Sequence, residues 1–196
     1  MKYFSQLKAA LFLASLYPLL RLFWFAYTNQ LGANPIELIT RSLGTWTLVF
    51  LLITLSITPL RKLSGWSWLV RLRRMAGLFA FFYALLHFIT YIWLDQFFDL
   101  DDIIKDVIKR PFITIGFAAF VLLIPLAITS TNAMMKKLGG KRWQLLHRLI
   151  YVIAIFAVLH YWWLVKKDIT QPLIYATVLA VLLAYRLWAR RIKSAS

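Results

Sequence analysis

The stretch that decides the fold runs from Met75 to Leu94 and reads MAGLFAFFYALLHFITYIWL. Its 20 residues include no Asp, Glu, Lys or Arg. A helix of about 20 mostly apolar residues is long enough to cross the hydrocarbon core of a bilayer. We therefore expect this stretch to form a transmembrane helix that carries one histidine, His87, inside the membrane.

Five further stretches have the same character, which gives six predicted spans at 7–27, 43–60, 75–94, 111–129, 145–165 and 172–189. Hydrophobic residues make up 62% of the chain and charged residues 15%. An ordinary soluble domain is about half apolar and about a quarter charged. The sequence predicts an all-α integral membrane protein, a single six-helix domain over residues 1–196. Its partner is the lipid bilayer and not a nucleic acid.

Charged residues divide unequally between the two ends of this predicted bundle. All 7 acidic residues fall in the odd-numbered connections between spans, together with six basic ones. The termini and the even-numbered connections, together with the ends of the spans that adjoin them, hold 16 of the 23 Lys and Arg residues: Lys2, Lys8, Arg61, Lys62, Arg71, Arg73, Arg74, Lys136, Lys137, Lys141, Arg142, Arg148, Arg186, Arg190, Arg191 and Lys193. Because cytoplasmic loops carry an excess of Lys and Arg, we expect both termini in the cytoplasm.

The predicted spans contain no Asp or Glu, but they hold Arg21 and all 3 histidines of the chain. His87 lies in the third span, and His147 and His160 lie in the fifth. Ionisable residues inside a membrane are costly and usually functional. The absence of an acidic relay argues against a proton pump or an ion-coupled transporter, so the histidines are the candidate functional residues.

His87 and His160 are expected at nearly the same depth. The third and fifth spans run in the same direction, with His87 eight residues before Asp95 and His160 six residues before Lys166. At about 1.5 Å per residue, the two imidazoles lie roughly 12 and 9 Å below the outer boundary. Two histidines at one level on adjacent helices can ligate one metal from opposite sides.

His147 lies thirteen residues before His160, about 20 Å away along the helix and near the cytoplasmic face. The matching positions of the third span hold Arg73 and Arg74, so no histidine is expected opposite His147. On an ideal helix this spacing also turns His147 about 140° away from His160. Helix tilt and side-chain rotamers have to compensate for that rotation.

Two histidine ligands with apolar and aromatic surroundings suit a b-type heme. Zinc prefers three or four ligands, Cys and carboxylates among them, and the chain has no cysteine. Copper is not excluded by ligand type, although two histidines alone make an incomplete copper site. The alternative is that each histidine only forms a hydrogen bond to a neighbouring helix.

The segment 140–151, GKRWQLLHRLIY, resembles the Trp-x-x-Leu-His-Arg-Leu-x-Tyr signature of the ferric-reductase-like transmembrane family. Members of that family hold two stacked b hemes between their third and fifth helices. The sequence is similar, in particular, to the bacterial heme-binding membrane subunits of periplasmic protein-methionine-sulfoxide reductase systems. The segments that carry this closer resemblance are Asn34-Pro35, ITPLR at 57–61, RLRRMAGL at 71–78 and LLH at 85–87.

This resemblance implies a multi-pass protein of the bacterial inner membrane that takes electrons from the quinone pool or from a cytosolic flavin reductase. The electrons would pass to a periplasmic, molybdopterin-containing catalytic subunit that reduces methionine sulfoxide in oxidised proteins. The resemblance implies heme b, with one or two hemes left open, and FMN. It matches His87, His147 and His160 to heme-iron ligands and Arg73 to an arginine standing in place of a fourth histidine. No residue of this chain is expected to catalyse sulfoxide reduction itself.

Two other functions stay open at this point. One is a self-contained transmembrane ferric or quinone reductase that acts without a partner subunit. The other is a heme-free transporter or scaffold. A GxGxxG motif after a strand marks a dinucleotide-binding domain, and this sequence has no such motif. The chain is therefore not expected to take electrons directly from NAD(P)H, and they are expected to arrive from another molecule.

Overall fold

The computed structural model describes residues 3–195, including all their side chains except those of residues 190 and 193–195. Lys2 therefore lies outside the described residues, as do the side chains of Arg190 and Lys193. In the described part of the chain every regular element is helical. The elements are α1 (Phe4–Tyr27), α2 (Pro35–Ser64), η1 (Ser67–Leu69), α3 (Val70–Thr90), η2 (Tyr91–Asp95), α4 (Leu100–Lys109), α5 (Pro111–Ile128), α6 (Asn132–Leu138), α7 (Gly140–His147), α8 (Leu149–Leu164) and α9 (Thr170–Ala195).

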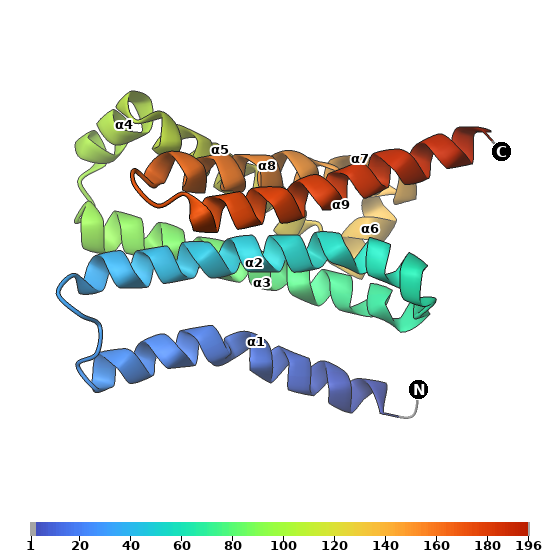
Figure 1. The fold of residues 1–196 in the computed structure, drawn as a ribbon, viewed down its shortest axis with the longest axis horizontal. Coiled ribbons are helices and arrows are strands. Elements are labelled where there is room, and N and C mark those ends of the chain that lie inside the picture. Colours follow the sequence, from blue (N-terminus) through green and yellow to red (C-terminus); the bar gives the residue numbers. More distant parts are fainter. Residues whose placement is uncertain (1–2, 196) are drawn as a thin grey trace.

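Six helical segments in this part of the chain are long and apolar enough to cross a membrane, which confirms the predicted number of spans. They are Phe4–Tyr27, Pro35–Ser64, Ser67–Asp95, Pro111–Ile128, Gly140–Leu164 and Thr170–Ala189. The protein is thus a multi-pass membrane protein. Both chain ends lie at one end of the bundle and α4 lies at the other (Figure 1). We call these the basic end and the acidic end, after their predominant charges.

The second span is longer than predicted because its caps lie outside its apolar stretch. Asn34 precedes α2, and its Oδ1 accepts the backbone N–H of Glu37 at 3.2 Å. Pro35 takes the first helical position, where its missing N–H costs nothing. Gly65 ends the helix in the left-handed conformation at a φ of 73°. The helix therefore continues through residues 35–42, which the hydropathy pattern alone excluded.

The fifth span is broken where a continuous helix was predicted. The helix α7 ends at His147, α8 begins at Leu149, and Arg148 lies between them. The backbone N–H groups of Arg148 and Tyr151 donate to the carbonyls three residues earlier, Leu145 and Arg148, at 3.1 Å each. Such three-residue turns rotate the chain further per residue than an α-helix does. This break changes the relative rotation of His147 and His160 that an ideal helix would impose.

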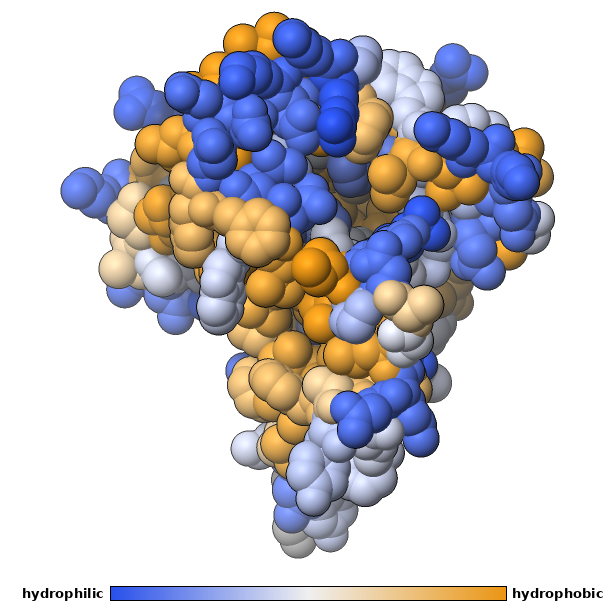
Figure 2. Space-filling view, turned by 90° about the vertical axis from the view of Figure 1, so that its left-hand side faces the viewer, coloured by the Kyte–Doolittle hydropathy of each residue, from blue (hydrophilic) through white to orange (hydrophobic). Residues whose placement is uncertain are grey.

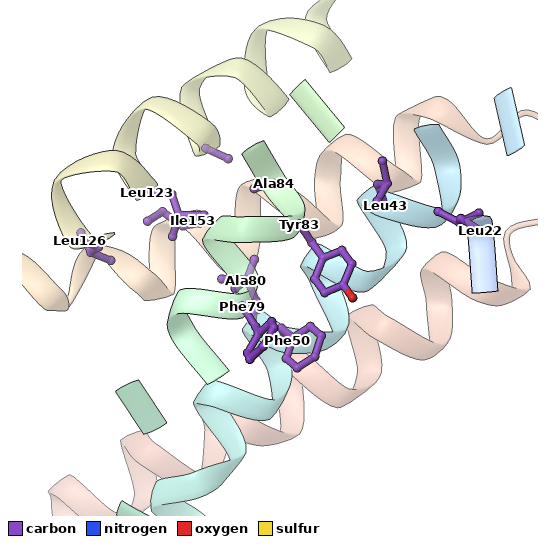
Figure 3. Packing of buried hydrophobic residues seen from close by; sticks show 12 residues of the cluster. Leu22, Leu43, Phe50, Phe79, Ala80, Tyr83, Ala84, Leu123, Leu126 and Ile153 are labelled. Carbon is purple, nitrogen blue, oxygen red and sulfur yellow. The ribbon is translucent and has the colours of Figure 1, made fainter. Parts of the chain in front are cut away.

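The core lies between α2, α3, α5 and α8 and is largely aromatic on the α2–α3 side (Figure 3). The Phe50 ring stacks on Tyr83 and on Phe79 with centroid distances of 5.5 and 5.4 Å. The hydroxyl of Tyr83 donates to the backbone carbonyl of Ser15 at 2.7 Å and so joins α3 to α1. This packing sets the spacing of the helices that carry the histidines.

Large apolar side chains also cover the outside of the bundle. Leu13, Phe23 and Val181 are 65%, 64% and 63% exposed in the protein alone. Apolar surface of this extent is not stable in water but is the normal lipid-facing surface of a membrane protein. The outer faces of α1 and α9 are therefore covered by the bilayer.

Candidate functional site

The structure brings His87 and His160 together, as their predicted depths require. Their ring centroids are 6.1 Å apart, and the ring planes are inclined at 75°. His87 comes from α3 and His160 from α8, so the pair joins two helices that are distant in sequence. Both rings lie in the half of the bundle nearer the acidic end, because both residues fall in the last turns of their helices before that end.

His87 is held by α2. Its Nδ1 lies 2.8 Å from the backbone carbonyl of Thr40. One turn further along α2 is Gly44, where an added Cβ would lie 3.1 Å from Cε1 of the ring. The glycine lets the ring approach the helix backbone closely enough to reach the carbonyl.

His160 is held in the same way by α5. Its Nδ1 lies 2.7 Å from the backbone carbonyl of Phe112. Gly116 follows one turn later, and a Cβ there would come within 2.7 Å of that same Nδ1. Each histidine therefore rests on a carbonyl and on a glycine four residues later, supplied by a neighbouring helix.

These hydrogen bonds fix the protonation of both rings. A carbonyl oxygen can only accept, so Nδ1 of His87 and Nδ1 of His160 each carry a proton. In a neutral imidazole the other nitrogen, Nε2, then keeps its lone pair and can bind a metal. A backbone carbonyl that orients a ligating histidine is a common outer-shell arrangement at metal sites.

The two histidines line a common cavity of about 320 Å³. Its walls come from α2, α3, α5 and α8 and are mostly apolar, with Leu48, Phe120 and Ile153 among the lining residues. This volume is near the lower end of the range for small-molecule and cofactor sites, about 300–1,000 Å³. A mostly apolar cavity of this size can hold an apolar ligand, and the imidazoles of His87 and His160 lie in its wall.

Charged residues surround the cavity at the acidic end. Arg41, Asp95 and Arg110 contribute to its lining there. Arg41 pairs with Glu37 at 2.7 Å and Arg110 pairs with Asp106 at 3.3 Å, in each case with the acidic residue four positions earlier in the chain. Figure 2, which looks onto this end, shows hydrophilic surface on either side of a hollow with apolar walls. The apolar site therefore opens between two cations that are already partly neutralised.

His147 does not join this pair. Its Nε2 lies 3.0 Å from Oγ1 of Thr129, and its ring stacks on Trp143 with a centroid distance of 3.9 Å. The Thr129 hydroxyl donates to the carbonyl of Pro125 at 2.6 Å, so it accepts from Nε2–H of His147. The nitrogen that is free in the other two histidines is thus a hydrogen-bond donor here.

Arg73 lies in the first turn of α3, and His147 lies at the end of α7. Among the described residues, those lining the cavity do not include Arg73 or Arg21. The Arg21 guanidinium instead lies over the ring of Phe25, 5.4 Å from its centroid.

The sequence analysis missed the residues that hold the histidines. Gly44 and Gly116 are the only glycines within α2 and α5, and an isolated glycine inside an apolar helix signals a close approach. That signal was available. The Thr40 and Phe112 carbonyls carry no sequence signal, because every residue has one. Within residues 3–195 no three His, Asp or Glu side chains gather in a metal-binding group.

Comparisons with known proteins identify the family of this chain. The family model of the ferric reductase-like transmembrane component matches residues 7–158. A protein-methionine-sulfoxide reductase heme-binding subunit, MsrQ, of Herminiimonas arsenicoxydans is 63% identical over 97% of this chain and 89% of its own length. The subunit of the same name from Azospira oryzae is 57% identical over 95% of this chain and 80% of its own length. The one from Ralstonia nicotianae is 54% identical over 95% and 87%, respectively.

Proposed function

Since the chain belongs to the ferric reductase-like transmembrane family, and within it to the heme-binding subunits of protein-methionine-sulfoxide reductase, we propose that it binds heme b and conducts electrons across the membrane. His87 and His160 would hold the heme iron. The electrons would serve a periplasmic catalytic subunit that repairs oxidised methionine in proteins. The proposed localisation is the bacterial inner membrane.

One observation carries this proposal: two imidazoles, each with Nδ1 against a backbone carbonyl, line the same apolar cavity, so that Nε2 is the nitrogen left to bind a metal. Because bonds between a metal and an imidazole nitrogen are about 2 Å long, rings with centroids 6.1 Å apart leave room for one metal ion between them. A metal held by protein alone would need more ligands than these two. A heme supplies most ligands of its iron itself, so His87 and His160 would be enough to hold it.

When bound, the heme supplies an iron centre that accepts and releases single electrons. The protein supplies the rest. The Thr40 and Phe112 carbonyls hold the imidazole rings and raise the basicity of their Nε2 atoms, which makes these atoms stronger metal ligands. The apolar walls exclude water and lower the local dielectric, which tunes the reduction potential. Arg41 and Arg110 would meet the anionic carboxylates of the heme at the acidic end.

The electron route follows from the proposed orientation, with the basic end in the cytoplasm. Electrons would enter there from the quinone pool or a cytosolic flavin reductase and leave near the His87–His160 pair. His147 and Arg73 would form a second heme site or an entry point at the basic end. In the structure His147 donates to Thr129, so ligation would require that hydrogen bond to break. FMN and a molybdopterin-containing acceptor belong to the proposal through the family resemblance.

A reduced-minus-oxidised visible spectrum of the detergent-purified protein, with heme quantified per chain, tests the proposal. We expect a b-type spectrum that is lost in His87→Ala and in His160→Ala. His147→Ala is the control variant and should retain the spectrum of the heme held by His87 and His160. A colourless protein from heme-replete cells, or an unchanged spectrum in His87→Ala, would contradict the assignment. Anaerobic addition of a quinol, or of a flavin reductase with NADPH, then identifies the donor.

A further inference from the structure

The short helix α4 at the acidic end has a sharply two-sided sequence, LDDIIKDVIK. Helical spacing puts the five apolar residues of α4 on one side and its charged residues on the other. The apolar residues are Leu100, Ile103, Ile104, Val107 and Ile108, and the charged ones are Asp101, Asp102, Lys105, Asp106 and Lys109. A hydrophobic face on a helix outside the bundle needs something to cover it.

Protein covers only part of this face. Ile103 and Val107 are half-buried, and Val107 lines the cavity. Leu100, Ile104 and Ile108 are 72%, 56% and 74% exposed. These three residues are spaced four apart, so they form one row along the helix, which we call the outer row.

Two phenylalanines extend the outer row at the start of α4. Phe97 and Phe98 are 78% and 62% exposed. Their φ angles are 47° and 62°, in the left-handed region that bulky residues rarely adopt. The backbone N–H of Phe98 donates to the Ile92 carbonyl at 2.9 Å, which helps to hold this turn. The chain thus carries two adjacent, exposed aromatic residues in a strained turn directly before α4.

The position of α4 relative to the spans indicates what can cover the outer row. The preceding span ends at Asp95 and the following one begins at Pro111, so α4 cannot move far from the membrane boundary. Figure 1 shows it beside the ends of the spans, at the acidic end. Figure 2 looks onto that end of the bundle. In the upper part of this view, the surface that faces the viewer is hydrophilic and the outer edge is apolar. On the polar side of α4, Asp106 is half-buried against the end of the bundle, whereas Asp101, Asp102, Lys105 and Lys109 are exposed.

We propose that α4 is an interfacial anchor: its outer row, with Phe97 and Phe98, inserts into the boundary between headgroups and acyl chains of the leaflet at the acidic end. Low overall hydrophobicity combined with a strongly polar opposite face is the pattern of helices that lie in this plane. The helix carries three Asp and two Lys. It therefore has no net positive charge, and its attraction is to the apolar boundary rather than to anionic headgroups.

This anchor acts on the cavity entrance. Asp106, on the polar side of α4, lies 3.3 Å from Arg110, 3.2 Å from Gln96 and 3.5 Å from the Tyr91 hydroxyl. Arg110 and Tyr91 both line the cavity. A helix seated in the leaflet through one face therefore positions, through its other face, the charged groups at the mouth of the site.

The experiment uses the absence of cysteine from the chain. Two single-cysteine variants, Ile104→Cys in the outer row and Asp102→Cys on the opposite side, are labelled with the same environment-sensitive fluorophore. Ile104 is 56% exposed, and the Asp102 side chain is 62% exposed, so the two labels start from similar accessibility. Both proteins are reconstituted into nanodiscs of zwitterionic phosphatidylcholine, in which both membrane faces are open to solvent. Helical circular dichroism and elution volume confirm that each variant is folded.

We expect the label at position 104 to be quenched by nitroxide-bearing lipid and protected from iodide, with the reverse at position 102. Iodide quenching should differ at least threefold between the two sites, and anionic lipid should not change it. Equal iodide quenching at both sites would overturn the proposal and make the outer row a surface for a soluble partner. The readout needs no heme and no electron transfer, so it is independent of the proposed function.

Discussion

Gly116 of α5 lies directly against the imidazole of His160: a Cβ at position 116 would come within 2.7 Å of Nδ1. That space is taken because the ring donates to the Phe112 carbonyl, one turn earlier on the same helix. Position 116 therefore has no room for a side chain while His160 keeps this hydrogen bond. The absence of one carbon atom in α5 sets the orientation of a ring in α8.

Gly116→Ala should displace His160 and lower the heme content several-fold. The methyl group forces the ring from its carbonyl, so Nε2 loses its fixed position. Helix propensity works in the opposite direction, because Ala is better than Gly within a helix by roughly 0.5–1 kcal/mol. The pyridine hemochrome assay gives heme per chain, and thermal unfolding checks that the protein is folded.

Gly77→Ala is the matched control, since a Cβ there meets only Thr54, at an ordinary 3.7 Å. Gly44→Ala should be intermediate, because its Cβ would lie 3.1 Å from His87 and the ring can yield slightly. The expected order of heme loss is thus position 116, then 44, then 77. Equal heme content in Gly116→Ala and Gly77→Ala would mean that the close contact does not set the ligand geometry.

Thr129→Val should lower stability without changing the spectrum of the His87–His160 heme. Thr129 is buried at 7% exposure and accepts from Nε2–H of His147. Removing the hydroxyl leaves Nε2–H of the half-buried His147 without its partner, at a cost of about 0.5–1.5 kcal/mol. Unfolding by denaturant measures this loss, and Thr177→Val serves as control because Thr177 is exposed. A spectral change in Thr129→Val would instead mean that His147 influences the heme held by His87 and His160.

Much of this architecture could be predicted, because it follows from hydropathy and helix rise. The six spans and the common depth of His87 and His160 need only counting along the chain. The break at Arg148 could not be predicted, since nothing in LLHRLIY disfavours a continuous helix. The protonation of the histidines could not be predicted either. It depends on which backbone carbonyls face Nδ1, and tertiary packing alone decides that.

Arg110→Gln should lower the reduction potential of the heme. A cation near the iron destabilises the more positive ferric state, so removing it favours oxidation. The Arg110 side chain is 55% exposed and paired with Asp106, so the change should be small, about 0.2–1 kcal/mol or roughly 10–40 mV for one electron. Potentiometric titration followed by visible absorbance measures it. Lys166→Gln, at the same end but away from the cavity, should leave the potential unchanged; an equal shift there would indicate a general surface-charge effect.

Arg186 of α9 donates from Nη2 to the backbone carbonyl of Leu55 in α2. Four residues after Leu55 is Pro59, which has no N–H with which to complete the helical hydrogen bond to that carbonyl. The same guanidinium donates to Leu182 at 3.0 Å and lies over the ring of Tyr151, 5.3 Å from its centroid. Arg186 thus joins α2, α8 and α9 around a carbonyl that the proline leaves without its usual partner.

Arg186→Met should therefore destabilise the bundle by about 1–3 kcal/mol, the cost of a carbonyl without a donor in a poorly hydrated site. Placing the same change in a Pro59→Ala background should cost less, because the alanine N–H can then reach the Leu55 carbonyl. A double-mutant cycle, with unfolding in mixed micelles as the measurement, isolates this coupling, and contacts between neighbours are typically coupled by about 0.5–3 kcal/mol. An equal cost of Arg186→Met in both backgrounds would mean that the missing backbone N–H of Pro59 plays no part. Arg186 would then stabilise α9 through Tyr151 and Leu182 alone.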